Sequence, residues 1–96
     1  MLKTDKQIDE IKKILTVWNP LGDRSITIKD LDEYNTEAND IYFHITVDFQ
    51  FPKKGDPQIR TQNIVREILN EAFNLNLTKE ECIEPSIRIH KIILNK

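Results

Sequence analysis

The 96-residue sequence predicts one all-α domain, residues 1–96, folded as a small orthogonal or antiparallel bundle of four main helices. Three segments repeat isoleucine and other apolar residues at spacings of three and four, the period of a helix face that packs on a core. Helix-start signals precede these segments. With 15 isoleucines but only two glycines and two alanines, composition alone fits helices and strands equally well. The prediction therefore depends on where the isoleucines lie.

The first helix is expected over residues 5–18. Its apolar side chains recur at helical spacing: Ile8, Ile11, Ile14, Leu15, Val17 and Trp18. Thr4 and Gln7 have the spacing of a capping box, in which each side chain bonds the backbone amide of the other residue. Asn19-Pro20 ends the helix, because a proline disfavours the helical conformation of the residue before it. A loop over residues 20–29 follows, with its turn at Gly22-Asp23.

The segment from Leu31 to Phe51 fits two periods. Every second residue from Ile41 to Phe51 is apolar, which is typical of a strand. A helical spacing fits an overlapping set: Leu31, Tyr34, Ala38, Ile41, Tyr42, Ile45 and Phe49. On pattern alone, a helix over about 34–47 and a strand over 41–51 are almost equally favoured, and the strand would make the fold α+β.

Two further helices are expected in the second half of the chain. Asp56 is suited to cap a helix over about 58–74, and Pro57 to occupy its first position, where the missing N–H has no cost. Thr78 and Glu81 form a second capping box, which predicts a helix over 79–94. Pro85 falls inside that helix and removes one hydrogen bond, so a strand over 86–94 is the alternative. The predicted core gathers around Trp18, Tyr42, Phe43 and Phe73.

The charge of the chain is concentrated in its middle third. The net charge is −2, but residues 23–48 hold seven acidic and two basic side chains, a charge of −5. Five of these seven acidic residues form a candidate interaction surface for a basic partner: Asp30, Asp32, Glu33, Glu37 and Asp40. The alternative is an ordinary solvated helix face. No interleaving of basic and aromatic residues predicts nucleic-acid binding, and no apolar run is long enough to span a membrane.

One polar stripe has the spacing of a metal site. If the middle segment is helical, its members lie on successive turns: Glu37, Asp40, His44 and Asp48. Carboxylate and imidazole groups on successive turns hold divalent metals in helical bundles. No second segment offers a matching Glu-x-x-His motif, so a solvated helix face is the favoured interpretation. The sequence has no phosphate-binding glycine loop and no nucleophile elbow, and we expect neither enzymatic activity nor a cofactor.

Two isolated residues have structural interpretations. Cys82 is the only cysteine, which excludes an intrachain disulfide, and its position on an apolar stripe predicts an inert buried thiol. His90 lies on the same stripe and is expected at the edge of the core. No targeting signal is recognisable, so the expected location is the cytoplasm.

The most distinctive motif is the pentapeptide Trp18-Asn19-Pro20-Leu21-Gly22. We interpret it as a structural corner in which Trp18 closes the core, the Asn19 side chain bonds nearby backbone amides, and Gly22 supplies a positive φ. The run from Asp32 to Ile41 follows it.

These two motifs together resemble the YugE-like family of small bacterial proteins of unknown function. Its members carry a Trp-Asp-Pro-hydrophobic-Gly turn and then a helix of the type Tyr-x-Thr-Glu-Ala-x-Asp-Val. The resemblance extends over about residues 8–94 and includes Asp56-Pro57 and Glu81-Cys82. It implies an all-helical fold, and therefore a helix over 34–47, but it assigns no activity.

The sequence departs from the family pattern in three places. Asn19 replaces an aspartate, extra residues lie within 48–55, and Pro85 interrupts the last helix. The extra residues would allow the second helix to end early and residues 49–51 to run extended.

For function, we expect a non-enzymatic protein-interaction module with an acidic surface and a basic, unidentified protein partner. A concrete alternative is an immunity-type protein that neutralises a basic toxin. A further alternative is a small metal-binding protein that uses the stripe from Glu37 to Asp48. The chain is expected to be a monomer or a homodimer, with Phe49-Gln50-Phe51 as a candidate contact between two copies.

Overall fold

The structure is a computed structural model that describes residues 3–22, 26, 34–51 and 54–94. These residues form four helices, α1 (Lys3–Trp18), α2 (Asn35–Gln50), α3 (Pro57–Phe73) and α4 (Lys79–Leu94), with no strand among them. The all-α prediction is confirmed. The alternative strands over 41–51 and 86–94 are wrong, because both segments are helical. Among the described residues, no helix combines the length and the apolar composition that crossing a bilayer requires.

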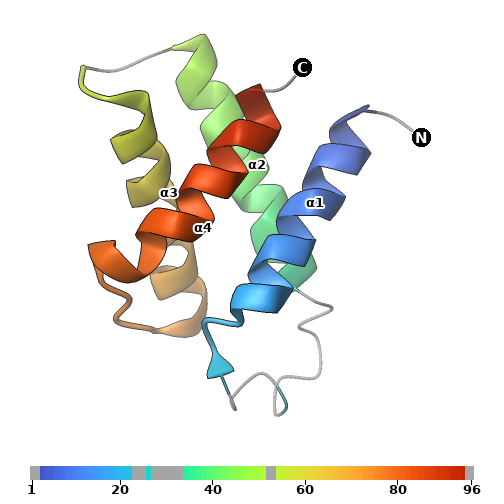
Figure 1. Ribbon diagram of the computed structural model, residues 1–96, viewed down its shortest axis with the longest axis vertical. Coiled ribbons are helices and arrows are strands. Elements are labelled where there is room, and N and C mark those ends of the chain that lie inside the picture. The colour runs from blue at the N-terminus through green and yellow to red at the C-terminus, as the bar shows by residue number, and fades with distance from the viewer. Residues whose placement is uncertain (1–2, 23–25, 27–33, 52–53, 95–96) are drawn as a thin grey trace.

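Each of the four helices packs mainly on two neighbours, and α2 and α4 also make a smaller contact with each other. Figure 1 shows α1 and α4 side by side and antiparallel, with α2 behind them and α3 on the far side of α4. The amide Nε2 of Gln7, near the start of α1, donates a hydrogen bond of 3.0 Å to the carbonyl oxygen of Ile92, near the end of α4. The domain measures 37 × 34 × 18 Å, so it is two helix layers thick. One side of each helix therefore faces solvent.

The core is aliphatic and collects one stripe from each helix. Its buried side chains are Ile8, Ile11, Leu15, Leu21, Tyr34, Ala38, Ile41, Ile45, Val65, Leu69, Ile89 and Ile93. Trp18, Tyr42 and Phe73 pack against this cluster, as predicted. Phe43 does not, and its predicted place in the core is wrong, because it lies about 200° around the helix from Ile41 and Ile45. The prediction that Val17 widens the stripe of α1 is wrong for the same geometric reason, since Val17 is exposed.

The helix starts test the capping predictions. The carboxylate of Asp56 accepts from the backbone amide of Gln58 at 3.0 Å, with Pro57 at the first position of α3. At α4 the Thr78 hydroxyl accepts from the Glu81 amide at 3.2 Å, and the Glu81 carboxylate accepts from the Thr78 amide at 3.1 Å. Both predictions are confirmed. The capping box at Thr4 is wrong, because α1 already includes Thr4 and the Gln7 side chain reaches α4 instead.

A corner follows α1, as the pentapeptide predicts, but its hydrogen bonds differ from the expected ones. Asn19 and Gly22 both have positive φ, 48° and 59°. Within the described residues, the Asn19 side chain bonds a carbonyl oxygen and a hydroxyl instead of backbone amides. Its Nδ2 donates to the carbonyl oxygen of Gly22 at 3.2 Å, and its Oδ1 accepts from the hydroxyl of Tyr34 at 2.6 Å. The Tyr34 hydroxyl also accepts from the amide of Leu21 at 3.3 Å, so a buried tyrosine fastens the start of α2 to the end of α1.

The second helix extends further than predicted. It runs to Gln50 rather than Val47, so the expected extended conformation is wrong for residues 49–50, while Phe51 follows the helix with a non-helical backbone (φ −129°, ψ 67°). Phe49 packs against the core, and Asp48 forms an ion pair with Arg60 of α3, so interactions on its inner side hold the last turn of α2 in place. The helix α4 likewise continues through Pro85 to Leu94.

Candidate interaction surface

The outward face of α2 carries a row of exposed apolar side chains. Phe43, Val47 and Phe51, here called the outer stripe, are spaced by four residues and are 60%, 53% and 72% exposed. The inner stripe, Ile41, Ile45 and Phe49, has the same spacing and packs in or against the core. The two stripes are offset by two residues, or about 200° around the helix. An amphipathic surface helix normally has a polar outer face, so α2 has one more apolar face than the fold of a single chain uses.

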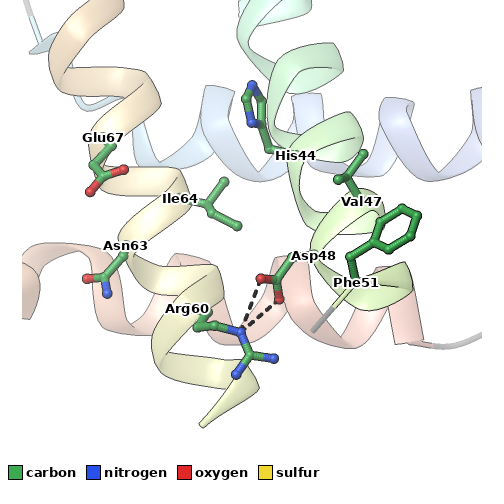
Figure 2. Close-up of a pocket in the computed structure, with 8 residues that line it drawn as sticks. All are labelled: His44, Val47, Asp48, Phe51, Arg60, Asn63, Ile64 and Glu67. Carbon is green, nitrogen blue, oxygen red and sulfur yellow. Dashed lines mark hydrogen bonds and ion pairs between the residues drawn. The ribbon is translucent and has the colours of Figure 1, made fainter. Parts of the chain in front are cut away.

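A shallow groove of about 400 Å³ lies between α2 and α3, beside the outer stripe. It is lined by His44, Val47, Asp48, Phe51, Arg60, Asn63, Ile64 and Glu67. Figure 2 shows Val47 and Phe51 next to one another on α2, on the side of Asp48 that faces away from α3. The groove therefore has an apolar edge that continues onto the outer face of α2.

The main polar feature of the groove is an ion pair at its base. The Arg60 Nε lies 3.1 and 3.0 Å from the two carboxylate oxygens of Asp48, and Arg60 Nη1 donates to the carbonyl oxygen of Gly55 at 2.6 Å. The two side chains are only 13% and 10% exposed. These groups satisfy one another and fasten the end of α2 to the start of α3. The pair has a structural role, and the other polar side chains of the groove are His44, Asn63 and Glu67.

The predicted metal stripe is not assembled into one site. Glu37 is buried, Asp40 and His44 are exposed, and Asp48 is bonded to Arg60. The part of the chain that the structure describes contains no group of three or more His, Cys, Asp or Glu side chains that could hold a metal ion. Helical spacing places these residues on one side of α2, but a residue added every four positions drifts about 40° around the axis. The drift turns Asp40 towards solvent and Asp48 towards α3.

The predicted acidic surface is only partly described. Asp30, Asp32 and Glu33 lie outside the described residues. Asp40 is exposed on α2, as expected. Glu37 was expected on the surface and is instead 9% exposed, because it points towards the packed side of α2. Burial raises the pKa of the Glu37 carboxyl, and the nearby charge of Asp40 raises it further, although the Glu37 backbone amide opposes the shift.

Replacing Glu37 with glutamine is expected to stabilise the protein at neutral pH. Because the pKa of Glu37 is higher in the folded than in the unfolded chain, its ionisation costs free energy of folding. Glu37→Gln should therefore melt at a higher temperature than the parent at pH 7. The difference should shrink as the pH falls towards the ordinary range of a glutamate carboxyl, because the raised pKa lets the native carboxyl take up its proton before the pH reaches that range. Thermal melts over this pH range check the prediction, and Glu71→Gln, at an exposed site on α3, is the control.

Two side chains of a kind that often takes part in catalysis, His90 and Cys82, lie in or at the edge of the core. His90 Nδ1 lies 2.9 Å from the Thr61 hydroxyl, and its ring packs edge-to-face on Phe49 at 5.4 Å. Burial lowers the pKa of His90. Thr61 is buried and is not among the residues that line the α2–α3 groove, so this hydroxyl–imidazole pair joins α3 to α4 and does not face a substrate. The prediction of a satisfied histidine at the core edge is confirmed.

The thiol of Cys82 is also inert, as predicted. Its side chain is fully buried, and burial raises the thiol pKa to about 11, although the charge of Arg66 opposes the shift. A thiol that is both buried and protonated is a poor nucleophile.

A second groove, of about 410 Å³, lies between α1 and α4. It is lined by Ile14, Val17, Trp18, Glu80, Glu81, Glu84, Pro85 and Arg88. Two of its three carboxylates already have partners: Glu81 caps α4, and Glu84 bonds Arg88 at 2.8 Å. The outer stripe is therefore the stronger candidate, because its side chains are mostly exposed, although the ring of Phe43 also contacts that of its neighbour Tyr42 edge-to-face at 6.2 Å.

Of the outer stripe, the sequence analysis singled out only Phe51, within the candidate contact Phe49-Gln50-Phe51; Phe51 is exposed, whereas Phe49 packs against the core. The spacing of Phe43, Val47 and Phe51 is helical, but it was interpreted as part of a strand-like alternation. Comparison of the chain with protein-family models, with curated proteins and with solved structures finds no match. The resemblance to the YugE-like family therefore stays a prediction from its motifs.

Proposed function

We propose that this protein is a non-enzymatic protein-interaction module that binds its partner through the outer face of α2. One observation carries the proposal: α2 is apolar on two opposite faces, and only one of them is used by the fold. A helix that is apolar all round is normally covered on all sides. The outer stripe supplies the second surface to be covered.

The size of the outer stripe supports binding to a protein. Taking about 200 Å² for a fully exposed phenylalanine, the three side chains expose roughly 300 Å² of apolar surface. Covering that area favours association through the hydrophobic effect, at about 25 cal/mol per Å² before the entropic cost of binding is subtracted. Two phenylalanines spaced two helical turns apart suit a partner that presents an elongated apolar surface, such as a helix.

The groove beside the stripe has few features of a catalytic site. Its lining residues include no serine, threonine, cysteine or lysine that would act as a nucleophile. The Asp48 carboxylate is fully engaged by Arg60. A binding surface is the simpler interpretation.

The charges around the stripe indicate the chemistry of the partner. Asp40 on α2 and Glu67 on α3 are exposed carboxylates close to the apolar row. We therefore propose a partner with apolar residues at the centre of its surface and a basic residue at the edge. A basic partner is also what the acidic segment over residues 23–48 predicts from the sequence.

Site-specific photo-crosslinking tests this function. A photoreactive phenylalanine analogue at position 43 of the full chain should form a discrete crosslinked product in the native cell, whereas the same analogue at Val17, an exposed residue of α1, should not. The product should disappear when Val47→Lys is added. Equal products from positions 43 and 17, or no product from position 43, would contradict the proposal.

A further inference from the structure

We propose that the partner on the outer face of α2 is a second copy of this chain, packed antiparallel along α2 about a two-fold axis through Val47. This inference rests on the proposed function and names its partner. It follows from the way the residues of this face are distributed around Val47.

The apolar residues of the face are symmetric about Val47. Phe43 and Phe51 each lie four positions from it, one on either side. In a two-fold antiparallel pair of helices, a residue before the axis lies opposite the residue equally far beyond it in the other copy. Phe43 of each chain therefore meets Phe51 of the other, and the two Val47 side chains meet on the axis. The stripe is complementary to itself.

The charges have the same symmetry with opposite signs. Asp40 lies on α2, seven positions before Val47, and Lys54 lies seven positions after it in the sequence, four residues beyond the last residue of α2. Both side chains are exposed. The two-fold arrangement brings the Asp40 of each copy to the same end of the contact as the Lys54 of the other. It also pairs the helix dipoles in opposite directions, which is the favourable order.

The polar groups on this face can be covered at little cost. The Asn39 side chain already donates to the carbonyl oxygen of Asn35 at 2.8 Å, and the Thr46 hydroxyl donates to the carbonyl oxygen of Phe43 at 2.9 Å. Covering a polar group is costly mainly when it loses its hydrogen bonds, and these two groups keep theirs within α2. Between Asp40 and Asp48, the only residues of α2 with ionisable side chains are Tyr42 and His44. This stretch of α2 therefore brings little unpaired charge to the contact.

The apolar area of the outer stripe indicates how tightly the two copies would bind. The apolar row is smaller than the roughly 800 Å² that each partner contributes to a standard interface. We therefore expect a reversible dimer with a dissociation constant in the micromolar range. Analytical ultracentrifugation of the purified full chain from about 1 µM to about 500 µM covers that range. The mass should rise from one chain towards two.

A pair of valine substitutions locates the contact. Val47→Lys places two like charges on the axis and should weaken dimerisation by at least about tenfold. Val17→Lys introduces the same charge at an exposed valine of α1 and should have no effect. Both sites are exposed, so both variants should fold, which circular dichroism checks. Equal effects of the two substitutions would overturn the inference.

Charge reversal and crosslinking test the register. Asp40→Lys and Lys54→Asp should each weaken the dimer, and the double variant should restore it, because the opposite charges then meet again across the axis. Val47→Cys should oxidise to a covalent dimer, while Val17→Cys should not. The native Cys82 does not interfere, because it is buried. Absence of rescue, or of the covalent dimer, would overturn the two-fold arrangement.

The outcomes separate this inference from the proposed function. If the purified chain stays monomeric at about 500 µM, the second copy is excluded as the partner. The crosslinking experiment at position 43 then decides the function alone: a product with a different protein keeps the interaction role and rejects the dimer, and no product rejects both.

Discussion

Replacing Tyr34 with alanine is expected to lower the free energy of unfolding by about 3–5 kcal/mol. Its ring is buried at the start of α2, 5.9 Å from the ring of Phe73 in an edge-to-face contact, and only 2% of its surface is exposed. A domain of this size has a total stability of roughly 5–14 kcal/mol, so this one substitution should remove a large fraction of it. Urea titration followed by the fluorescence of Trp18, the only tryptophan, measures the change.

The hydroxyl of Tyr34 should account for a separate part of this effect. Tyr34→Phe keeps the ring but removes the donor to Asn19 Oδ1 and the acceptor for the Leu21 amide, and should cost about 1–3 kcal/mol. Tyr42→Phe is the matched control, because its hydroxyl contacts only Thr4 at 3.5 Å on the exposed surface. It should change stability by less than about 0.5 kcal/mol. Equal effects of the two substitutions would show that the corner does not depend on the tyrosine hydroxyl.

Removing Arg60 is expected to cost about 3 kcal/mol. Arg60→Met leaves the Asp48 carboxylate nearly buried without its partner and also removes the bond to the Gly55 carbonyl. The exposed pair Glu84–Arg88 provides the control within the same chain. Arg88→Met should cost less than about 0.5 kcal/mol, since an exposed pair at this helical spacing contributes little. Chemical denaturation of both variants gives the comparison.

A double variant separates the two contributions of Arg60. If the loss in Arg60→Met comes from stranding the Asp48 charge, then adding Asp48→Leu should recover most of it, because a buried ion pair replaced by apolar side chains is often nearly neutral. A double variant as unstable as Arg60→Met would instead show that the Gly55 bond dominates.

The helical fold was largely predictable, and α2 shows why part of it was not. The inner stripe and the outer stripe each repeat every four residues and are offset by two, so together they place an apolar residue at every second position from 41 to 51. This alternation is indistinguishable from that of a strand. The ambiguity came from a real property of the helix, its two apolar faces. Phe43 was assigned to the core for the same reason, since spacing alone does not say which face is buried.

The side-chain environments were less predictable than the elements. The positions of Asp56, Thr78 and Glu81 follow from local capping rules, which involve only neighbouring residues. The burial of Glu37 and the pairing of Asp48 with Arg60 depend on how α2 meets α3, which no local pattern encodes. Likewise, the partner of Asn19 is Tyr34, fifteen residues away. Long-range contacts of this kind decide which polar residues remain free on the surface.

The place of Trp18 has a practical consequence. This residue lines the groove between α1 and α4, whereas the outer stripe lies on α2. Emission of the protein under tryptophan excitation therefore reports the state of one groove and should stay constant when the α2 face is covered. A molecule that occupies the α1–α4 groove should protect Trp18 from a soluble quencher, so titrating the quencher detects binding there without a label on the protein. The chain thus contains a built-in optical probe of a groove to which no role has been assigned.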